Sequence, residues 1–234
     1  MVSLRPCLEI RAFNMKKLVV ILLFLTACSS RAADLHQVIA GWLSKQTNIQ
    51  TWAADFTQTR TLRALSQPLV STGEVWFAAP QNFRWQLGGD QTIAIRNGET
   101  MLVIYPRLKR AEKYDFSNTP NNQWKDALAL LQTGFPRSEA EMKERFNLLG
   151  LEQTNALYEI KLEPKSRAAK RMMPKINLLL ATNTLELAGT ELVFMDGSKM
   201  RNEFRNIRTN SPVEGRFDLS IPPDFKLVEP LKNR

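Results

Sequence analysis

The chain has 234 residues, of which 44% are hydrophobic and 24% charged, and its formal net charge is +9 at neutral pH. This length suits one large domain or two small ones, and the ordinary apolar fraction excludes a disordered chain. Two cysteines and a single histidine exclude a disulfide-rich scaffold and a zinc module, and they argue strongly against histidine-based nucleophilic catalysis.

The first 33 residues have the pattern of an export signal. Met15-Lys16-Lys17 precedes an apolar run from Leu18 to Leu25, which small residues follow up to Ala33. The run is far shorter than the roughly 20 apolar residues that a membrane-spanning helix needs. We therefore expect an export signal at 15–33, an over-extended start at 1–14, a single domain at 34–234, and a periplasmic location.

Two cleavage sites are compatible with this signal. Ser30-Arg31-Ala32 fits a small-residue cleavage site, which would release a chain that begins at Ala33. Leu25-Thr26-Ala27-Cys28 resembles a bacterial lipobox, in which Cys28 would carry lipid and tether the protein to a membrane. Both interpretations stay open at the level of sequence.

The first half of the remaining chain predicts one helix and a meander of antiparallel strands. Asp34 is a candidate N-cap for a helix whose apolar residues, from Leu35 to Leu43, recur on one face. Alternating apolar residues then predict strands at 52–56, 73–77, 83–87, 93–95 and 100–105. Gly88-Gly89-Asp90 and Asn97-Gly98 supply two of the turns, and Asn-Gly is a strong hairpin signal.

The second half predicts two more helices and a further set of short strands. Helical periodicity runs from Trp124 to Leu131, and Ser138 begins a capping box for a short helix that ends near Phe146. Strands are expected at 148–152, 157–162, 176–180, 184–187, 191–195, 199–207 and 217–221. The fold class is therefore mainly β (α+β): an incomplete, strongly curved antiparallel barrel of about ten to eleven strands, with helices covering its concave face.

A basic segment stands out in this half of the chain. A solvated hairpin with basic decoration explains it, and so does a patch that meets anionic lipid headgroups or an acidic partner. Nucleic acid is not expected as a partner of an exported protein. The six residues are Lys161, Lys165, Arg167, Lys170, Arg171 and Lys175.

No catalytic motif is present, because nucleophile elbows, dinucleotide loops and phosphate-binding loops are all missing from the sequence. We expect no catalytic residue, metal or cofactor, and we expect His36 to be an exposed or capping residue. Scattered carboxylates favour a solvated surface over a glycosidase-like pair. They are Glu74, Asp90, Asp115, Asp126, Glu139, Glu141 and Glu144.

Several short motifs, in a specific order, resemble the family of localisation-of-lipoproteins carriers (LolA). They are Phe56-x-Gln58, Gly73-Glu74-Val75-Trp76-Phe77 with Pro80, Phe83-Arg84-Trp85, Asn97-Gly98, Tyr105-Pro106, Asp196-Gly197, Phe204-x-Asn206-Ile207 and Phe217-x-x-x-Ile221-Pro222-Pro223. The resemblance covers most of residues 35–228. It implies an unclosed barrel lidded by helices, which ferries acylated lipoproteins across the periplasm from an inner-membrane release complex to an outer-membrane receptor.

A carrier of this kind needs an apolar cavity, and strand alternation together with the resemblance suggests its lining. The same residues would also suit an ordinary packed core. The candidate residues are Phe56, Val75, Phe77, Phe83, Trp85, Ile93, Ile95, Leu102 and Ile104, with Leu128 and Leu131 on a lid helix.

One position departs from the family pattern. The family's better-known carriers have an arginine that hydrogen-bonds the lid helices just before the Pro80 equivalent, whereas this chain has Ala79 there. The nearest arginine along the chain is Arg84, so lid closure would rest on apolar contact or on another donor. Met172 and Met173 are flexible enough to line an adaptable mouth or to fill a gap.

The leading hypothesis is a non-catalytic, monomeric periplasmic carrier of lipoproteins or related acylated lipids. A membrane-tethered acceptor similar to the receptor LolB is the alternative if Cys28 is acylated. A periplasmic hydrolase that uses scattered carboxylates and a structural envelope protein with a solid core are the hypotheses from other classes.

Overall fold

The computed structural model describes residues 34–89, 91–117, 136 and 138–230, which belong to the compact unit Ala33–Arg234. Several predictions fall outside the described residues. These are the export signal at 15–33, Cys28, Asp90, Asp126 and the helix at 124–131 with Leu128 and Leu131.

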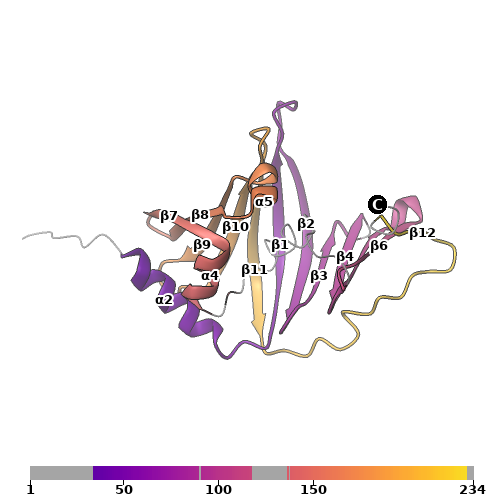
Figure 1. The fold of residues 1–234 in the computed structure, drawn as a ribbon, viewed down its shortest axis with the longest axis horizontal. Helices are drawn as coiled ribbons and strands as arrows, with labels where there is room; N and C mark the ends of the chain where they lie inside the picture. Colours follow the sequence, from indigo (N-terminus) through magenta and orange to yellow (C-terminus); the bar gives the residue numbers. More distant parts are fainter. Residues whose placement is uncertain (1–33, 90, 118–135, 137, 231–234) are drawn as a thin grey trace, which may run out of the picture. The chain divides into compact units, whose positions relative to one another are not determined.

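The described residues form one curled, open sheet of twelve strands (Figure 1). Its order is β12-β6-β5-β4-β3-β2-β1-β11-β10-β9-β8-β7, and every neighbouring pair is antiparallel except β12 and β6. The strands are β1 Thr51–Thr61, β2 Leu69–Ala78, β3 Asn82–Leu87, β4 Thr92–Asn97, β5 Thr100–Tyr105, β6 Arg110–Asp115, β7 Phe146–Gln153, β8 Leu157–Pro164, β9 Lys175–Ala181, β10 Leu187–Val193, β11 Lys199–Thr209 and β12 Lys226–Val228.

The helices that the structure describes are short, and the three α-helices among them have side-chain caps. In α2, Leu35–Gln46, the Oδ1 of the N-cap Asp34 accepts a hydrogen bond from the backbone N–H of His36 at 3.0 Å. In α4, Glu139–Arg145, the Oγ of Ser138 accepts one from the backbone N–H of Glu141 at 3.1 Å. The others are α5, Arg167–Met172, and the 3₁₀ helix η1, Pro106–Leu108.

We call the face of the sheet on which these α-helices pack the inner face, and the opposite face the outer face. Residues that pair directly across neighbouring strands place their side chains on the same face. At β7–β10, apolar side chains of the inner face form the largest core cluster together with α2, α4 and α5. Its fully buried members include Ile39, Trp42, Met142, Phe146, Ile160, Leu162, Ile176 and Leu180.

Residues 216–225, which follow β11 and which we call the C-terminal strap, cover the outer face at β4–β6. Phe217, Leu219 and Ile221 pack against a buried cluster on this face, and β12 then joins the sheet beside β6. The prediction of a strand at 217–221 is therefore wrong. An apolar strap that lies over a sheet alternates inward and outward side chains as a strand does, so periodicity alone does not separate the two.

The predicted fold class is confirmed, with differences in detail. The strand β6 was not predicted, because its sequence from Arg110 to Asp115 is mostly polar, and neither was the helix α5. The segment 184–187 is largely a turn, and β10 begins only at Leu187.

Candidate functional site

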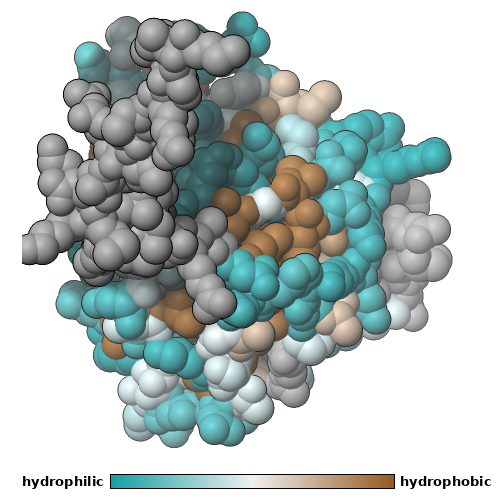
Figure 2. Space-filling view, turned by 90° about the vertical axis from the view of Figure 1, so that its left-hand side faces the viewer, coloured by the Kyte–Doolittle hydropathy of each residue, from teal (hydrophilic) through white to brown (hydrophobic). Residues whose placement is uncertain are grey.

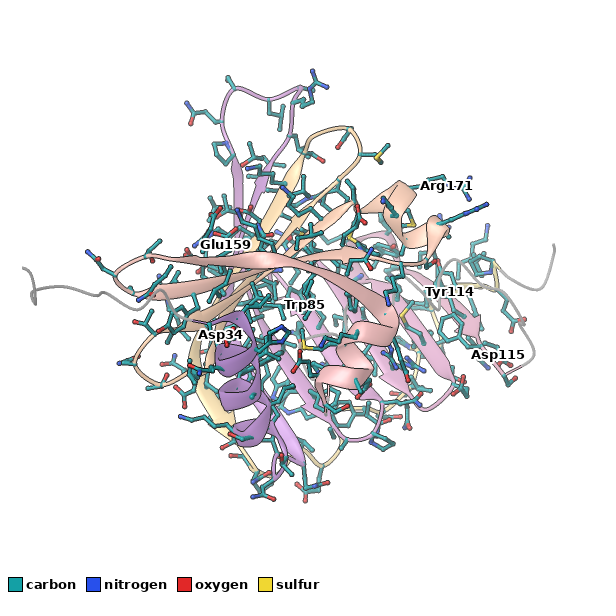
Figure 3. The ribbon with its side chains drawn as sticks, turned by 60° about the vertical axis from the view of Figure 1, so that its left-hand side comes forward. Asp34, Trp85, Tyr114, Asp115, Glu159 and Arg171 are labelled. Atoms are coloured by element: carbon teal, nitrogen blue, oxygen red, sulfur yellow. The ribbon has the colours of Figure 1, made fainter. Side chains whose placement is uncertain are left out.

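An apolar, aromatic-rich surface occupies the inner face where β1, β2 and β3 lie side by side. Ala54 pairs with Val75, which in turn pairs with Trp85, so these three side chains share the inner face. The rings of Phe56 and Trp85 are in contact, with centroids 4.0 Å apart. Figure 3 shows Trp85 near the middle of the sheet, with Tyr114 and Asp115 toward its β6 end.

This surface continues across β4, β5 and β6. Ala94 pairs with Trp85 and Val103, and Met101 pairs with Tyr114. The two buried clusters of the inner face on this half of the sheet share Phe77 and Trp85 as packing partners, so they form one continuous apolar surface. Its buried members are Trp52, Ala54, Phe56, Val75, Phe83, Met101, Tyr114 and Phe116.

A pocket of about 410 Å³ adjoins this apolar surface at the Phe77 end. That volume lies in the range of small-molecule sites. Its wall brings together the end of α2, the chain that leads into β1, the turn between β2 and β3, and α4. The lining residues are Gln46, Thr47, Ile49, Gln50, Phe77, Ala79, Pro80, Gln81, Pro136, Glu141 and Arg145.

The polar groups of the pocket are mostly amides and one ion pair. The guanidinium of Arg145 lies 3.4 Å from a carboxylate oxygen of Glu141, so the charges of these two residues offset each other. The Oε1 of Gln46 is buried and has no hydrogen-bond partner among the described residues. A buried carbonyl oxygen without a donor costs about 1–3 kcal/mol, which a ligand N–H or O–H could recover.

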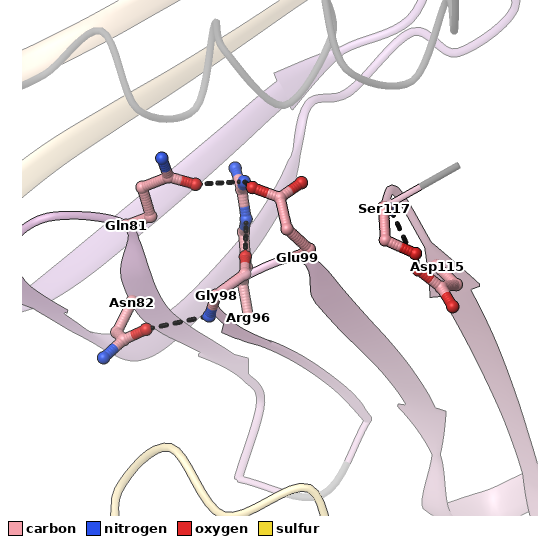
Figure 4. Close-up of polar contacts among 7 residues, drawn as sticks. All are labelled: Gln81, Asn82, Arg96, Gly98, Glu99, Asp115 and Ser117. Atoms are coloured by element: carbon pink, nitrogen blue, oxygen red, sulfur yellow. Dashed lines mark hydrogen bonds and ion pairs between the residues drawn. The ribbon is translucent and has the colours of Figure 1, made fainter. Parts of the chain in front are cut away.

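A buried arginine fixes the rim of this pocket (Figure 4). Arg96 lies on the inner face, where its Nη2 donates to the Oε1 of Gln81 at 2.6 Å and its Nε donates to the backbone oxygen of Gly98 at 2.7 Å. The backbone N–H of Gly98 donates in turn to the Oδ1 of Asn82 at 3.0 Å. Burial lowers the pKa of Arg96, and the nearby carboxylate of Glu99 acts in the opposite direction. These bonds hold the β2–β3 turn against the β4–β5 turn.

The structure divides the predicted cavity residues between two faces. Phe56, Val75, Phe77, Phe83 and Trp85 come together on the inner face. The other four strand residues do not join them, because Arg84 and Gln86 of β3, whose side chains point to the outer face, pair with Ile95 and Ile93. The expectation of a single shared face is therefore wrong for Ile93, Ile95, Leu102 and Ile104, which pack beneath the C-terminal strap.

The two residues expected at a lid also separate. Ala79 lines the pocket, but Arg84 pairs with Trp76 and Ile95 on the outer face. There its guanidinium lies 6.0 Å from the Trp76 ring centroid, and Arg216 of the strap lies 4.5 Å from the same ring. Burial and the charge of Arg216 lower the pKa of Arg84. Arg84 therefore does not replace an arginine at position 79, whereas Arg96 bonds to the lining residue Gln81 and Arg145 lines the pocket itself.

Sequence reasoning missed several residues of the inner face, namely Trp52, Leu87, Ala94, Met101, Val103, Tyr114 and Phe116. Alternation counted in twos from Trp85 leads to Ile93 and Ile95, so only the pairing of β3 with β4 places Ala94 on the inner face. The phenol of Tyr114 donates to the Oε2 of Glu112 at 2.6 Å, and burial together with this bond raises the pKa of Tyr114.

Three of the six basic residues singled out by sequence have partners of their own. Lys161 pairs with Glu152, Lys170 pairs with Glu163 at 2.7 Å, and Lys165 donates to a backbone carbonyl. Met173 belongs to the main core cluster and Met172 is exposed on α5, and neither lines the 410 Å³ pocket. Figure 2 shows a mostly polar surface on the side where α2 and α4 lie, with a band of apolar residues between the polar ones.

No cluster of three or more potential metal ligands occurs among the described residues. His36 lies at the surface, with its Nδ1 2.7 Å from Oε1 of Glu139. Side-chain hydrogen bonds are the main cause that lowers the pKa of the carboxyl groups of Asp115, Glu139 and Asp196. A carboxyl group that acts as a general acid needs a raised pKa instead.

In the part of the chain that the structure describes, no helix has both the length and the apolar character needed to cross a bilayer. A family model described as outer membrane lipoprotein carrier protein LolA matches residues 47–218. No curated protein of similar sequence was found.

Three solved structures illustrate the structural similarity. A LolA superfamily protein from Nitrosomonas europaea is 8% identical, with 80% of this chain and 98% of that chain covered and a TM-score of 0.40. An uncharacterized conserved protein from Thermus thermophilus is also 8% identical, with 84% and 99% covered and a TM-score of 0.49. The lipoprotein LppX from Mycobacterium tuberculosis is 10% identical, with 79% and 100% covered and a TM-score of 0.37.

Proposed function

The chain belongs to the family of the outer membrane lipoprotein carrier protein LolA, and from this premise we propose that it shields the acyl chains of lipoproteins during their transfer from the inner to the outer membrane. The residues expected to contact the acyl chains are those of the inner face at β1–β3. The observation that supports this role most directly is the continuous aromatic surface there, together with the pocket that adjoins it at Phe77.

The energetics of such a role are favourable for this surface. An exposed methylene costs about 0.8 kcal/mol in water, so an acyl chain of roughly 14 methylenes costs on the order of 11 kcal/mol when unshielded. Phe56, Phe77, Phe83 and Trp85 offer large apolar contact areas on rigid strands. The pocket beyond Phe77 supplies amide and charged groups for the glyceryl and peptide part of the cargo.

Location and partners follow from the same proposal. The pattern at 15–33 supports export to the periplasm, and membership of the family supports transfer between an inner-membrane release complex and an outer-membrane receptor. A form tethered through Cys28 is the second candidate, which the lipobox-like sequence Leu25-Thr26-Ala27-Cys28 favours. Mass spectrometry of the mature N-terminus separates the two, because only the tethered form begins with a lipid-modified cysteine.

The test is the lipid content of the protein itself. Protein purified from the periplasm without detergent should yield acylated lipid or lipoprotein on extraction, and a delipidated sample should bind a fluorescent fatty-acid probe that lipoprotein displaces. Failure of the delipidated protein to bind any acyl probe would contradict the carrier role. Turnover of an ester or glycoside substrate would favour a hydrolase instead.

A further inference from the structure

A second surface, separate from the pocket, gathers exposed apolar and basic side chains at one end of the sheet. It comprises the end of the β1–β2 hairpin (residues 60–70), the end of α5 with the start of β9 (Arg171, Met172 and Lys175), and the turn between β10 and β11 (residues 195–199), and we call it the basic–apolar tip. In Figure 1 the β1–β2 hairpin extends beyond the other strands, and the β10–β11 turn lies beside it.

Hydrogen bonds and strand pairing join the three parts of the tip. The backbone N–H of Met195 in the β10–β11 turn donates to the backbone oxygen of Met172 at the end of α5, at 3.2 Å. The Nη1 of Arg63 in the β1–β2 connection donates to the backbone oxygen of Asp196 at 3.4 Å. Thr61 pairs with Lys199 where β1 and β11 meet this end of the sheet. The three parts therefore form one surface.

Apolar exposure in the described chain is concentrated at this tip. Of the eight large hydrophobic side chains that are exposed, five belong to it: Leu65, Leu69, Val70, Met172 and Met195, with exposed fractions of 45%, 47%, 63%, 41% and 64%. The other three, Leu108, Leu149 and Leu227, lie on elements outside the tip. Exposed apolar side chains that are gathered on one surface mark an interaction site, whereas scattered ones do not.

Positive charge surrounds these apolar residues. None of the exposed cations Arg60, Arg171, Lys175 and Lys199 makes an ion pair with a described residue. Figure 3 shows Arg171 on the outside of α5. Of the acidic side chains nearby, Glu163 is paired with Lys170, and Asp196 is a single carboxylate that accepts two hydrogen bonds from Ser198.

We propose that the basic–apolar tip docks on the surface of a bilayer that contains anionic lipid. The apolar side chains sit at the ends of two hairpins and of a short helix, so they can enter the boundary between headgroups and acyl chains. The surrounding cations then meet lipid phosphates. An acidic protein surface would engage the cations, but it would not need aliphatic side chains at protruding turns.

Docking of this kind goes beyond the shielding of acyl chains and uses different residues. It would bring the carrier directly to a membrane, where cargo is collected or delivered. No residue of the tip lines the 410 Å³ pocket or belongs to the apolar clusters of the inner face. The two functions can therefore be tested separately.

The test is co-sedimentation of the purified protein with vesicles of phosphatidylglycerol and phosphatidylethanolamine in equal amounts, and with vesicles of phosphatidylcholine. We expect binding to the anionic vesicles alone, with release at high salt. Leu65→Glu and Met195→Glu should each weaken binding at least fivefold, and Lys199→Gln by about fivefold, because one cation near an anionic surface contributes about a fivefold change in affinity. Leu108→Glu and Leu149→Glu are matched controls, since they add the same charge at exposed leucines outside the tip.

Three results would overturn the proposal: no preference for anionic vesicles, an equal loss in the tip and control variants, or binding to an acidic polypeptide without binding to vesicles. Circular dichroism checks that each variant is folded. Binding of a monomeric fluorescent fatty acid should be unchanged in the tip variants, which distinguishes a failure of docking from a failure of acyl-chain shielding.

Discussion

The ring of Phe56 on β1 lies against the ring of Trp85 on β3, although β2 runs between these two strands. The contact is possible because the residue of β2 that pairs with Phe56 is Gly73. A Cβ at Gly73 would lie 2.5 Å from Cζ of Phe56 and 2.2 Å from the backbone oxygen of Gln86. The glycine therefore lets the two aromatic rings meet across the middle strand and makes the apolar inner face continuous.

Gly73→Ala tests this relationship. The new methyl group would clash with backbone as well as with a ring, so we expect the free energy of unfolding to fall by about 1–3 kcal/mol. Urea unfolding measures the change. Thr72→Ala is the control, because it alters an exposed side chain at the neighbouring position of the same strand. Equal effects of the two substitutions would contradict the role given to Gly73.

The division of the predicted cavity residues between the two faces gives a second prediction. Trp85→Ser should weaken the binding of a fluorescent fatty acid about tenfold or more, because it removes a large contact from the inner face. Ile93 lies on the next strand but beneath the C-terminal strap. Ile93→Ser should therefore lower stability and leave the affinity of the folded protein for the fatty acid nearly unchanged. A comparable loss of affinity in both variants would show that the faces are wrongly assigned.

Oε1 of Gln46, which has no partner among the described residues, leads to a prediction of increased stability. Gln46→Met keeps the length of the side chain and removes this buried carbonyl, so the ligand-free protein should become more stable by about 1 kcal/mol. Thermal or urea unfolding of delipidated protein provides the measurement. A clear loss of stability would mean that this oxygen has a partner in solution.

Arg96 is expected to be the most sensitive charged residue at the pocket rim. Arg96→Met removes hydrogen bonds to Gln81 and Gly98 and should cost about 2–3 kcal/mol of stability. Arg84→Met on the outer face is the comparison, and a smaller loss is expected because Arg84 keeps more contact with solvent. If Arg84→Met proves the more damaging change, the rim is not held by Arg96.

The contact between α2 and α4 should weaken in acid. Oε1 of Glu139 lies 2.7 Å from Nδ1 of His36 and 2.8 Å from Nζ of Lys143, and these hydrogen bonds lower the pKa of Glu139 from its ordinary value of 4.5. A lowered carboxyl pKa contributes stability that is present above pH 4.5 and is lost as pH falls toward the folded-state pKa. Melting temperatures of the wild type and Glu139→Gln should converge in that range, and a constant difference down to low pH would contradict the prediction.

Strand alternation was sufficient for most of the antiparallel strands, although not for the polar β6, and it selected Phe56, Val75, Phe77, Phe83 and Trp85 of the inner face of β1–β3. It failed at β4 and β5, whose two faces are both apolar, so that Ile93 and Ile95 looked like better cavity residues than Ala94. Only the register shows that Ala94 pairs with Trp85. The cover over the outer face could not be foreseen either, since Phe217, Leu219 and Ile221 alternate as strand residues do.

The pocket could not be predicted from the sequence, because distant parts of the chain form it. The end of α2, the β2–β3 turn and α4 are far apart along the chain, and their amide and charged side chains carry no periodic signal. Ala79 was identified through a family resemblance, but Arg96, which bonds to Gln81 at the rim, lies on another strand. Its position became visible only when β3 and β4 were paired.

The most direct test of the central claim is to locate a bound acyl chain by photo-crosslinking. A fatty acid with a photoreactive group near its methyl end would be bound to delipidated protein, irradiated, and mapped by mass spectrometry of the resulting peptides. We predict crosslinks to inner-face residues of β1–β3, such as Phe77 and Trp85. Crosslinks confined to the outer face or to residues 217–225 of the C-terminal strap, or no crosslinks at all, would contradict the claim that the inner face holds the acyl chain.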